Sequence, residues 1–219
     1  GGAIWNARNV LKSEDHFLVA NGDEVLIPQN EDILVDLISA HKSSGALCSL
    51  LTCDHPELRK KLKPVWLNNK REVLGFGMDP ISPEAIPVHY TGYKVFSRKI
   101  FDYLPEGESN IFYDVVTKAL EKGEKVKAFH MDQATWHETG NFTSFIEASK
   151  SMSLNNLEAI NKRLAFFKYP TIELFNLKNG TLIAPEGFSL KESDHFENFV
   201  NLGSHVSIGE RVRLNNVIV

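Results

Sequence analysis

Apolar and polar positions follow two different periods along most of the chain. Short apolar runs over residues 17–20, 45–52 and 125–131 are typical of buried strands. Between them, apolar positions recur at helical spacing over residues 30–45 and 108–123, and each of these segments ends at or beside a glycine. Strands that alternate with helices predict an α/β fold with a mostly parallel sheet.

The other segments before residue 168 extend this alternation. Residues 64–80 have the pattern of a β-meander around the polar stretch "NNK", and β-branched and aromatic residues predict a strand over residues 88–96. Residues 141–152 and 154–167 have the spacing of amphipathic helices. The chain up to this point therefore has the elements of one α/β domain.

The last fifty residues have a six-residue period. In a parallel β-helix built from hexapeptides, positions six apart stack in one apolar ladder, whereas an α-helix places them on different faces. We therefore predict the beginning of a parallel β-helix, with a pair of alternating strands as the alternative. The positions that carry the period are Val200, Val206, Val212 and Ile218, and two places further on Leu202, Ile208 and Leu214.

Composition narrows the class of protein. The 219 residues are 42% hydrophobic, which is typical of a globular protein with one sizeable domain or two small ones. A formal net charge of −4 offers no basic surface for nucleic acid. Two cysteines, Cys48 and Cys53, are too few for a disulfide framework, and no apolar stretch approaches the roughly 20 residues needed to cross a bilayer. We expect a cytoplasmic protein in which both cysteines are core residues.

The segment "FLVANGDEVL" contains the first candidate for chemistry. Its apolar run stops at Asn21-Gly22-Asp23, and Asn-Gly is a strong turn signal. One interpretation is a tight hairpin with residues 24–27 as the returning strand. The other is a buried strand whose carboxyl end presents Asp23 to a ligand, as in open α/β sheets.

A second acidic candidate, Glu138, lies in "TWHETGNF", after the strand at 125–131 and before a helix. Two carboxylates at the carboxyl ends of strands in one sheet can converge although they are distant in sequence. Magnesium typically takes one or two such carboxylates together with substrate phosphates and water. The alternative for Glu138 is an acid that caps the following helix.

Four motifs then occur in the order and spacing of a known family. The segments "FLVANGDEVL", "VHYTGYKVFSRKIFDYLPEG" and "ATWHETGNFTSFIEA", followed by the six-residue period, resemble the sugar-1-phosphate nucleotidyltransferases, or NDP-sugar pyrophosphorylases. The opening "GGAIWNA" is similar to the Gly-rich loop and helix that precede the Asn-Gly-Asp strand in those enzymes. The resemblance covers essentially the whole chain.

This resemblance implies a fold in two parts. Residues 1–164 would form a partial nucleotidyltransferase catalytic domain, with a doubly wound, mostly parallel α/β sheet that is incomplete at the amino terminus. Residues 165–219 would begin a left-handed parallel β-helix of the hexapeptide type.

It also implies a reaction. An enzyme of this family joins a nucleoside triphosphate to a sugar 1-phosphate and releases pyrophosphate, with Mg²⁺ bound by two acidic residues. On that pattern Asp23 and Glu138 would be the catalytic residues and the metal ligands. The substrate-binding residues would be Gly2, Asn21, Gly22, Thr91 and Gly92, the last two in the sugar pocket. Trp136 would only pack, and His137 would be a bystander.

Three departures from the family pattern accompany the resemblance. The Gly-rich loop that wraps the triphosphate is absent, so the chain as given is expected to be inactive. Asp79 stands where many members have a phosphate-binding lysine, and Lys94 is one candidate for the replacing cation. Glu138 stands where the family usually has Asp, which adds one methylene group.

Two kinds of function therefore remain open. The first is the enzyme, and the second is a non-catalytic protein of the same fold that binds sugar nucleotides and regulates. The base and the sugar are not identified by the sequence. The carboxyl-terminal region is expected to serve in assembly of a homo-oligomer rather than as an acyltransferase.

Overall fold

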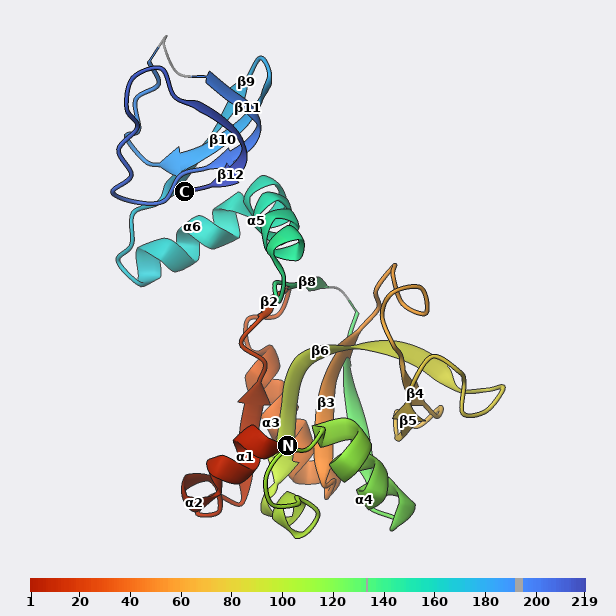
Figure 1. The fold of residues 1–219 in the computed structure, drawn as a ribbon. Helices are drawn as coiled ribbons and strands as arrows, with labels where there is room; N and C mark the ends of the chain where they lie inside the picture. The colour runs from red at the N-terminus through yellow and green to blue at the C-terminus, as the bar shows by residue number, and fades with distance from the viewer. Residues whose placement is uncertain (133, 192–194) are drawn as a thin grey trace. The chain divides into compact units, whose positions relative to one another are not determined.

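The chain folds into two compact units. The computed structural model describes residues 1–132, 134–191 and 195–219. Unit 1 is Gly1–Trp136 and unit 2 is His137–Val219, and each has its own hydrophobic core. Figure 1 shows the helices and strands of both. The predicted domain boundary at residues 164 and 165 stays a prediction about where the catalytic domain ends.

Unit 1 is built around a mixed six-stranded sheet with the order β5-β4-β6-β3-β7, in which β1 also pairs with β6. Only β3 and β7 pair in parallel, because β6 is antiparallel to β1, β3 and β4. The prediction of a mostly parallel sheet is therefore wrong for the strands around β6. The strands are β1 (His16–Ala20), β3 (Cys48–Cys53), β4 (Val65–Leu67), β5 (Val73–Phe76), β6 (Ile86–Ser97) and β7 (Val126–Met131).

The reversed strand β6 explains the mixture. It follows the β4–β5 pair, which is the meander predicted around "NNK", and it is long enough to pair with three neighbours. Because β1 and β3 both run against β6, and β7 runs parallel to β3, these three strands point the same way. Their carboxyl ends therefore share one edge of the sheet, and Asp23 follows β1 there. The prediction that Glu138 ends a strand of the same sheet is wrong, because β8 (Ala134–Glu138) pairs with β2 (Glu24–Pro28) in a separate two-stranded sheet.

Helices cover both faces of this sheet (Figure 1). Alternation along β3 places Cys48 and Leu50 in one core and Leu51 and Cys53 in the other. The first core also contains residues of α1, η2 and α4, and the second contains residues of α3, so the sheet is doubly wound. The bounds are α1 (Gly2–Asn6), α2 (Arg8–Leu11), α3 (Ile33–Ser44), η1 (Arg98–Asp102), η2 (Ile111–Val116) and α4 (Thr117–Glu121).

The predicted helix ends follow local chemistry. Gly45 takes a left-handed conformation with φ 63° after α3, as predicted for a glycine stop. Asn110 caps the next helix by accepting hydrogen bonds from the backbone N–H groups of Phe112 and Tyr113. That helix begins as a π-helical turn, η2, before it continues as α4. No helix in the described part of the chain combines the length and apolar character that a membrane span requires.

The Asn21-Gly22-Asp23 turn does not close a hairpin. The strand before it, β1, pairs with β6, whereas the strand after it, β2 (Glu24–Pro28), pairs with β8 (Ala134–Glu138). The turn thus passes the chain from one sheet to another. This arrangement excludes the hairpin alternative and places Asp23 just beyond the carboxyl end of β1.

Unit 2 consists of two helices and a four-stranded sheet with the order β12-β11-β10-β9. The outer pair β9–β10 is antiparallel, and β10, β11 and β12 are parallel. Gly180 pairs with Asn198 and His195 with Arg213, so these partners on successive parallel strands stand 18 positions apart; after a register shift in β11–β12, Val200 pairs with Val217 at a spacing of 17. The elements are α5 (Phe142–Asn155), α6 (Leu157–Phe166), β9 (Ile172–Leu177), β10 (Gly180–Pro185), β11 (His195–Asn201) and β12 (Arg213–Ile218).

The six-residue period supplies the core of unit 2. Val200 and Leu202 are fully buried, and Val206, Ile208 and Leu214 pack against the same cluster. A spacing of 18 between paired residues equals three of these six-residue periods. Five of the seven predicted positions therefore face the core, whereas Val212 and Ile218 are outside this cluster of the described residues.

Removing one member of this ladder should destabilise unit 2. Leu202 is 1% exposed, so Leu202→Ala should cost about 2–5 kcal/mol. Leu190, which is 40% exposed, is the matched control, and Leu190→Ala should change little. Hydrogen exchange of strand β11 measures the difference. Equal protection of β11 in both variants would contradict the ladder.

Two buried histidines in unit 1 are held neutral. His41 lies on α3 and shares hydrogen bonds with Ser49 Oγ at 2.8 Å and with His16 Nδ1 at 3.1 Å. Burial, with a smaller contribution from His16, lowers the pKa of His41 from 6.5 to about 4. Burial likewise lowers the pKa of His89 to about 4, with a smaller contribution from His55.

These shifts predict a loss of stability in mild acid. The unfolded chain protonates both rings near pH 6.5, whereas the folded chain resists protonation to about pH 4, so stability is complete above pH 6.5 and falls below it. All three tryptophans lie in unit 1, so tryptophan fluorescence during urea unfolding can compare about pH 7 with about pH 5, where carboxylates stay ionised. His41→Gln should flatten the pH dependence and His205→Gln, at an exposed position, should not. A free energy of unfolding that is unchanged at pH 5 would refute the prediction.

Candidate functional site

The candidate site of unit 1 lies where β1 ends beside the middle of β6. The last pair of the β1–β6 ladder is Ala20 with Tyr93, and the next backbone hydrogen bond runs from Asn21 N–H to the Gly92 carbonyl at 3.1 Å. The Asn-Gly-Asp turn is therefore fixed to Gly92 by the sheet itself. Asn21 and Gly92 are 71 positions apart in the chain but adjacent in the fold.

Strand β6 is irregular at this point. Between the pairs Leu50–Lys94 and Thr52–Tyr90 its register with β3 shifts, so that Leu51 faces a longer stretch of β6 that includes Thr91 and Gly92. Gly92 has φ 90°, a conformation that glycine adopts without strain. Thr91 is fully buried, and its hydroxyl donates to the Leu51 carbonyl at 3.0 Å. The bulge therefore has a side-chain anchor as well as a glycine.

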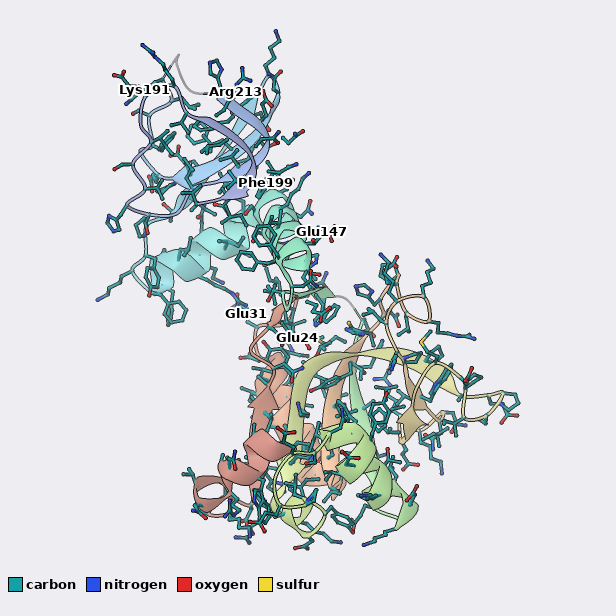
Figure 2. The ribbon with its side chains drawn as sticks, in the orientation of Figure 1. Glu24, Glu31, Glu147, Lys191, Phe199 and Arg213 are labelled. Carbon is teal, nitrogen blue, oxygen red and sulfur yellow. The ribbon has the colours of Figure 1, made fainter. Side chains whose placement is uncertain are left out.

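A carboxylate covers the open face of Gly92. The Cδ atom of Glu24 lies 2.7 Å from the position of a Cβ built on Gly92. The carboxylate accepts a hydrogen bond from Asn21 Nδ2 at 2.8 Å and a short one from Trp136 Nε1. Figure 2 labels Glu24 at the start of β2. The surface that the resemblance assigns to the sugar thus carries the Glu24 carboxylate.

Trp136 does more than pack. Its indole N–H, besides donating to Glu24, lies 3.2 Å from the Thr91 carbonyl, so one donor serves both the acid and the bulge. The ring is 8% exposed and meets His89 edge-on at 4.0 Å between ring centroids. The prediction that Trp136 is only a packing residue is incomplete, because this side chain fixes the position of Glu24.

Lys94 lies in the same network. It is 3% exposed, and its ammonium group donates to the Tyr90 hydroxyl at 2.7 Å and to Asn21 Oδ1 at 3.3 Å. Burial lowers the pKa of the Lys94 ammonium, and the opposite charge of Glu24 works against that shift. Burial also raises the pKa of the Tyr90 hydroxyl. A cation is therefore held directly beside the Asn-Gly-Asp turn.

Asp23 and Gly22 follow Asn21 in the exposed part of the turn. Within the described residues there is no cluster of three or more His, Cys, Asp or Glu side chains that could hold a metal. The Asp23 carboxylate is a hard oxygen donor of the kind that magnesium takes together with phosphate oxygens and water.

The remaining predicted residues lie elsewhere. Gly2 begins α1, and a Cβ on it would lie 3.0 Å from the Gly107 carbonyl oxygen, so Gly2 packs against backbone. Glu138 is exposed, ends β8 and belongs to unit 2. It does not cap α5, because Asn141 accepts the hydrogen bond from Ser144 N–H. The joint role of Asp23 and Glu138 as metal ligands stays a prediction.

Other residues of chemical interest have structural partners. His137, expected to be a bystander, shares a hydrogen bond with Ser151 at 3.0 Å, and burial lowers the pKa of its ring. Cys48 and Cys53 are buried, and burial raises the pKa of Cys53 to about 12. Both thiols are therefore unreactive core residues, as predicted.

Sequence reasoning missed Glu24 altogether and undervalued Trp136. Glu24 directly follows the Asn-Gly-Asp turn, where acidic residues are unremarkable on the surface. The signal for Lys94 was present, because a lysine inside the apolar strand "YTGYKVF" must be buried or must break the strand.

The sequence of residues 1–154 matches the profile of the nucleotidyl transferase family. The chain belongs to this family. That assignment covers unit 1 and α5 up to its last turn. No curated protein matches the chain by sequence.

Three solved structures share the fold. HddC from Yersinia pseudotuberculosis, solved with GMP-PN, is 17% identical, with a TM-score of 0.52 over 69% of this chain and 61% of its own. A putative glucose-1-phosphate thymidylyltransferase from Bacillus anthracis is 19% identical, with a TM-score of 0.52 over 68% of this chain and 58% of its own.

The third is the UTP-bound UGPase from Acinetobacter baumannii, which is 19% identical, with a TM-score of 0.55 over 75% of this chain and 60% of its own. The chain thus spans about three fifths of the length of the structures that it matches. At these identities the likeness establishes the mixed α/β fold of the nucleotidyl transferase family.

The crowding at Gly92 predicts a specific loss of stability. Gly92→Ala combines a positive φ with a clash against the Glu24 carboxylate, whereas Gly77, with φ 137°, has open space around its Cβ position. Both substitutions should cost about 1–3 kcal/mol for the backbone alone. Gly92→Ala should cost more than Gly77→Ala in urea unfolding, and Glu24→Ala should remove the excess. Equal losses would mean that Glu24 does not lie against Gly92.

Proposed function

We propose that the chain acts in sugar-1-phosphate nucleotidyl transfer. A phosphate oxygen of the sugar 1-phosphate attacks the α-phosphorus of a nucleoside triphosphate, the bond to the bridging oxygen of the β-phosphate breaks, and pyrophosphate leaves. The observation that carries the proposal is the junction of the Asn-Gly-Asp turn with the Thr91-Gly92 bulge at the carboxyl edge of the sheet. Family membership supports it, and so does the likeness in fold to a putative glucose-1-phosphate thymidylyltransferase and to a UGPase.

The chain's own residues have distinct parts in this proposal. Thr91 and Gly92 would line the sugar pocket on the family pattern, and the Glu24 carboxylate that covers Gly92 would then lie between this backbone and the sugar. Asn21 and Gly22 would contact the substrate from the opposite side of the same junction. Gly2 would belong to a loop near the base. The base and the sugar would be identified by testing each nucleoside triphosphate with a panel of sugar 1-phosphates.

Asp23 and Glu138 are proposed as the ligands of Mg²⁺. A bound magnesium ion would supply charge neutralisation for the phosphate oxygens in such a transfer. Asp23 is favoured by its place in the turn next to Asn21 and by the hard oxygen donors that it offers. For Glu138 the support is its position in the motif "TWHETGNF".

Unit 2 is proposed to begin a left-handed parallel β-helix. Support comes from the 18-residue spacing between paired residues of β10, β11 and β12 and from the buried six-residue ladder. Gly180 agrees with close stacking, since a Cβ there would lie 2.2 Å from the Asn198 carbonyl oxygen. Such a coil offers flat stacked strands, and we propose that it serves assembly between copies of the protein.

A second candidate is a non-catalytic protein that binds sugar nucleotides. Its specific support is the Glu24 carboxylate on the face of Gly92, together with Glu138 and Asp79 at positions where the family usually has Asp and Lys. Pyrophosphate release separates the two candidates. The protein that carries the Gly-rich triphosphate loop, for this assay and for the Asp23→Asn variant below, is incubated with magnesium, each nucleoside triphosphate and a panel of sugar 1-phosphates. Release with one pair supports the enzyme, whereas tight binding without release supports the regulator.

Asp23→Asn tests the enzyme directly. Loss of the carboxylate should lower the rate of pyrophosphate release by about 100-fold or more, in the range found for removing one charge-stabilising group, while the fold is kept because Asp23 is exposed. Asp15, at the other end of β1, gives the matched control, and Asp15→Asn should retain the rate. An unchanged rate for Asp23→Asn at saturating magnesium would reject the assigned role.

A further inference from the structure

Lys94 is an unusual lysine because it is buried without an acidic partner. It is 3% exposed, and no carboxylate of the described residues forms an ion pair with its ammonium group. A buried charge of this kind loses hydration that neutral partners restore only in part. An apolar residue of the same length would fit this strand position without the free-energy cost of dehydrating a charge. Stability of the strand therefore does not explain why a lysine is present.

Its contacts all lead to the Asn-Gly-Asp turn or to aromatic rings. Two of its three protons go to the Tyr90 hydroxyl at 2.7 Å and to Asn21 Oδ1 at 3.3 Å. The ammonium also lies 5.3 Å from the centroid of the Tyr90 ring and 5.9 Å from that of Phe112. The Tyr90 and Phe112 side chains thus lie around the ammonium group, and Asn21 is the residue of the turn that the ammonium group contacts.

The chemistry of its neighbours fixes the Asn21 amide. Lys94 can only donate, so it must face Oδ1, and the Glu24 carboxylate can only accept, so it must face Nδ2 at 2.8 Å. The Asn21 backbone N–H is already committed to the Gly92 carbonyl at 3.1 Å. A cation on one side and an anion on the other therefore hold one orientation of an otherwise exposed side chain.

We propose that Lys94 is a positioning residue that acts through Asn21 to hold the Gly22-Asp23 part of the turn in its binding geometry. The consequence for ligands rests on the proposed function, whereas the effect on the turn does not. On this proposal the Lys94 charge orders the turn and does not stabilise the hydrophobic core. Lys94 on β6, Asn21 in the turn after β1 and Glu24 at the start of β2 are thus connected in the order cation, amide, anion.

The first test needs no ligand. In the 219-residue chain, Lys94→Met should raise the hydrogen-exchange rate of the backbone in residues 21–24 roughly tenfold, the size expected for losing one charge-assisted hydrogen bond. Lys127, on β7, has a surface ion pair with Glu72 at 3.1 Å, and Lys127→Met is the matched control with no change in this segment. Unchanged exchange in Lys94→Met would overturn the inference.

The second test measures global stability. A positioning role predicts that the melting temperature is kept or raised, whereas a structural role in the core predicts that it falls. Lys94→Met should keep or raise the melting temperature, because the thioether side chain fills the strand position without a charge to dehydrate. A clear drop in melting temperature with unchanged exchange of the turn would assign Lys94 to the core instead.

A second variant covers the case in which Lys94→Met does not fold. Asn21 is exposed, so Asn21→Ala leaves the core intact and should loosen residues 21–24 to the same extent. In the double variant the two effects should not add, because both break the same link. Full protection of the turn in Asn21→Ala would overturn the inference.

Binding separates this inference from the proposed function. A sugar nucleotide that binds the unmodified chain should bind Lys94→Met at least about tenfold more weakly, with Lys127→Met unchanged. Equal affinity for the unmodified chain and Lys94→Met, together with a protected turn, rejects only the role of Lys94. Absence of binding by every sugar nucleotide rejects the proposed function and leaves the exchange experiment to decide on Lys94.

Discussion

One carboxylate organises the candidate site. Glu24 lies against the bare backbone of Gly92 and accepts hydrogen bonds from Asn21 on one side and Trp136 on the other. A larger residue at position 92 would push this carboxylate away, and loss of the indole donor would leave it unanchored. The turn, the bulge and the tryptophan therefore depend on one another, although they come from three distant segments of the chain.

The mixed sheet makes this meeting possible. Strand β6 runs antiparallel to β1 and continues past its end, so that the Gly92 carbonyl accepts the Asn21 N–H. The reversed strand brings a bulge from its centre to the edge where β1, β3 and β7 end. Ligand-binding edges of α/β sheets usually depend on loops alone, whereas here a strand contributes as well.

The Asn21 amide links the two charged side chains of this region. Its Oδ1 accepts a hydrogen bond from Lys94, and its Nδ2 donates one to Glu24. An amide between two charges has one orientation, and that orientation is the ordering element of the turn. Unit 1 therefore has a polar sheet edge, fixed by hydrogen bonds, next to its hydrophobic core.

The sequence by itself determined most helices and strands, because hydrophobic period and glycine stops are local properties. The family followed from the resemblance of four motifs, and for Asp23 the sequence left open a hairpin or the carboxyl end of a strand. Five of the seven positions of the six-residue period lie in or against the core of unit 2. Only the tertiary structure decided the reversal of β6, the cover that Glu24 forms over Gly92, and the donor role of Trp136. These depend on which strands pair and on hydrogen bonds between residues up to 112 positions apart, and a local pattern contains no information about either.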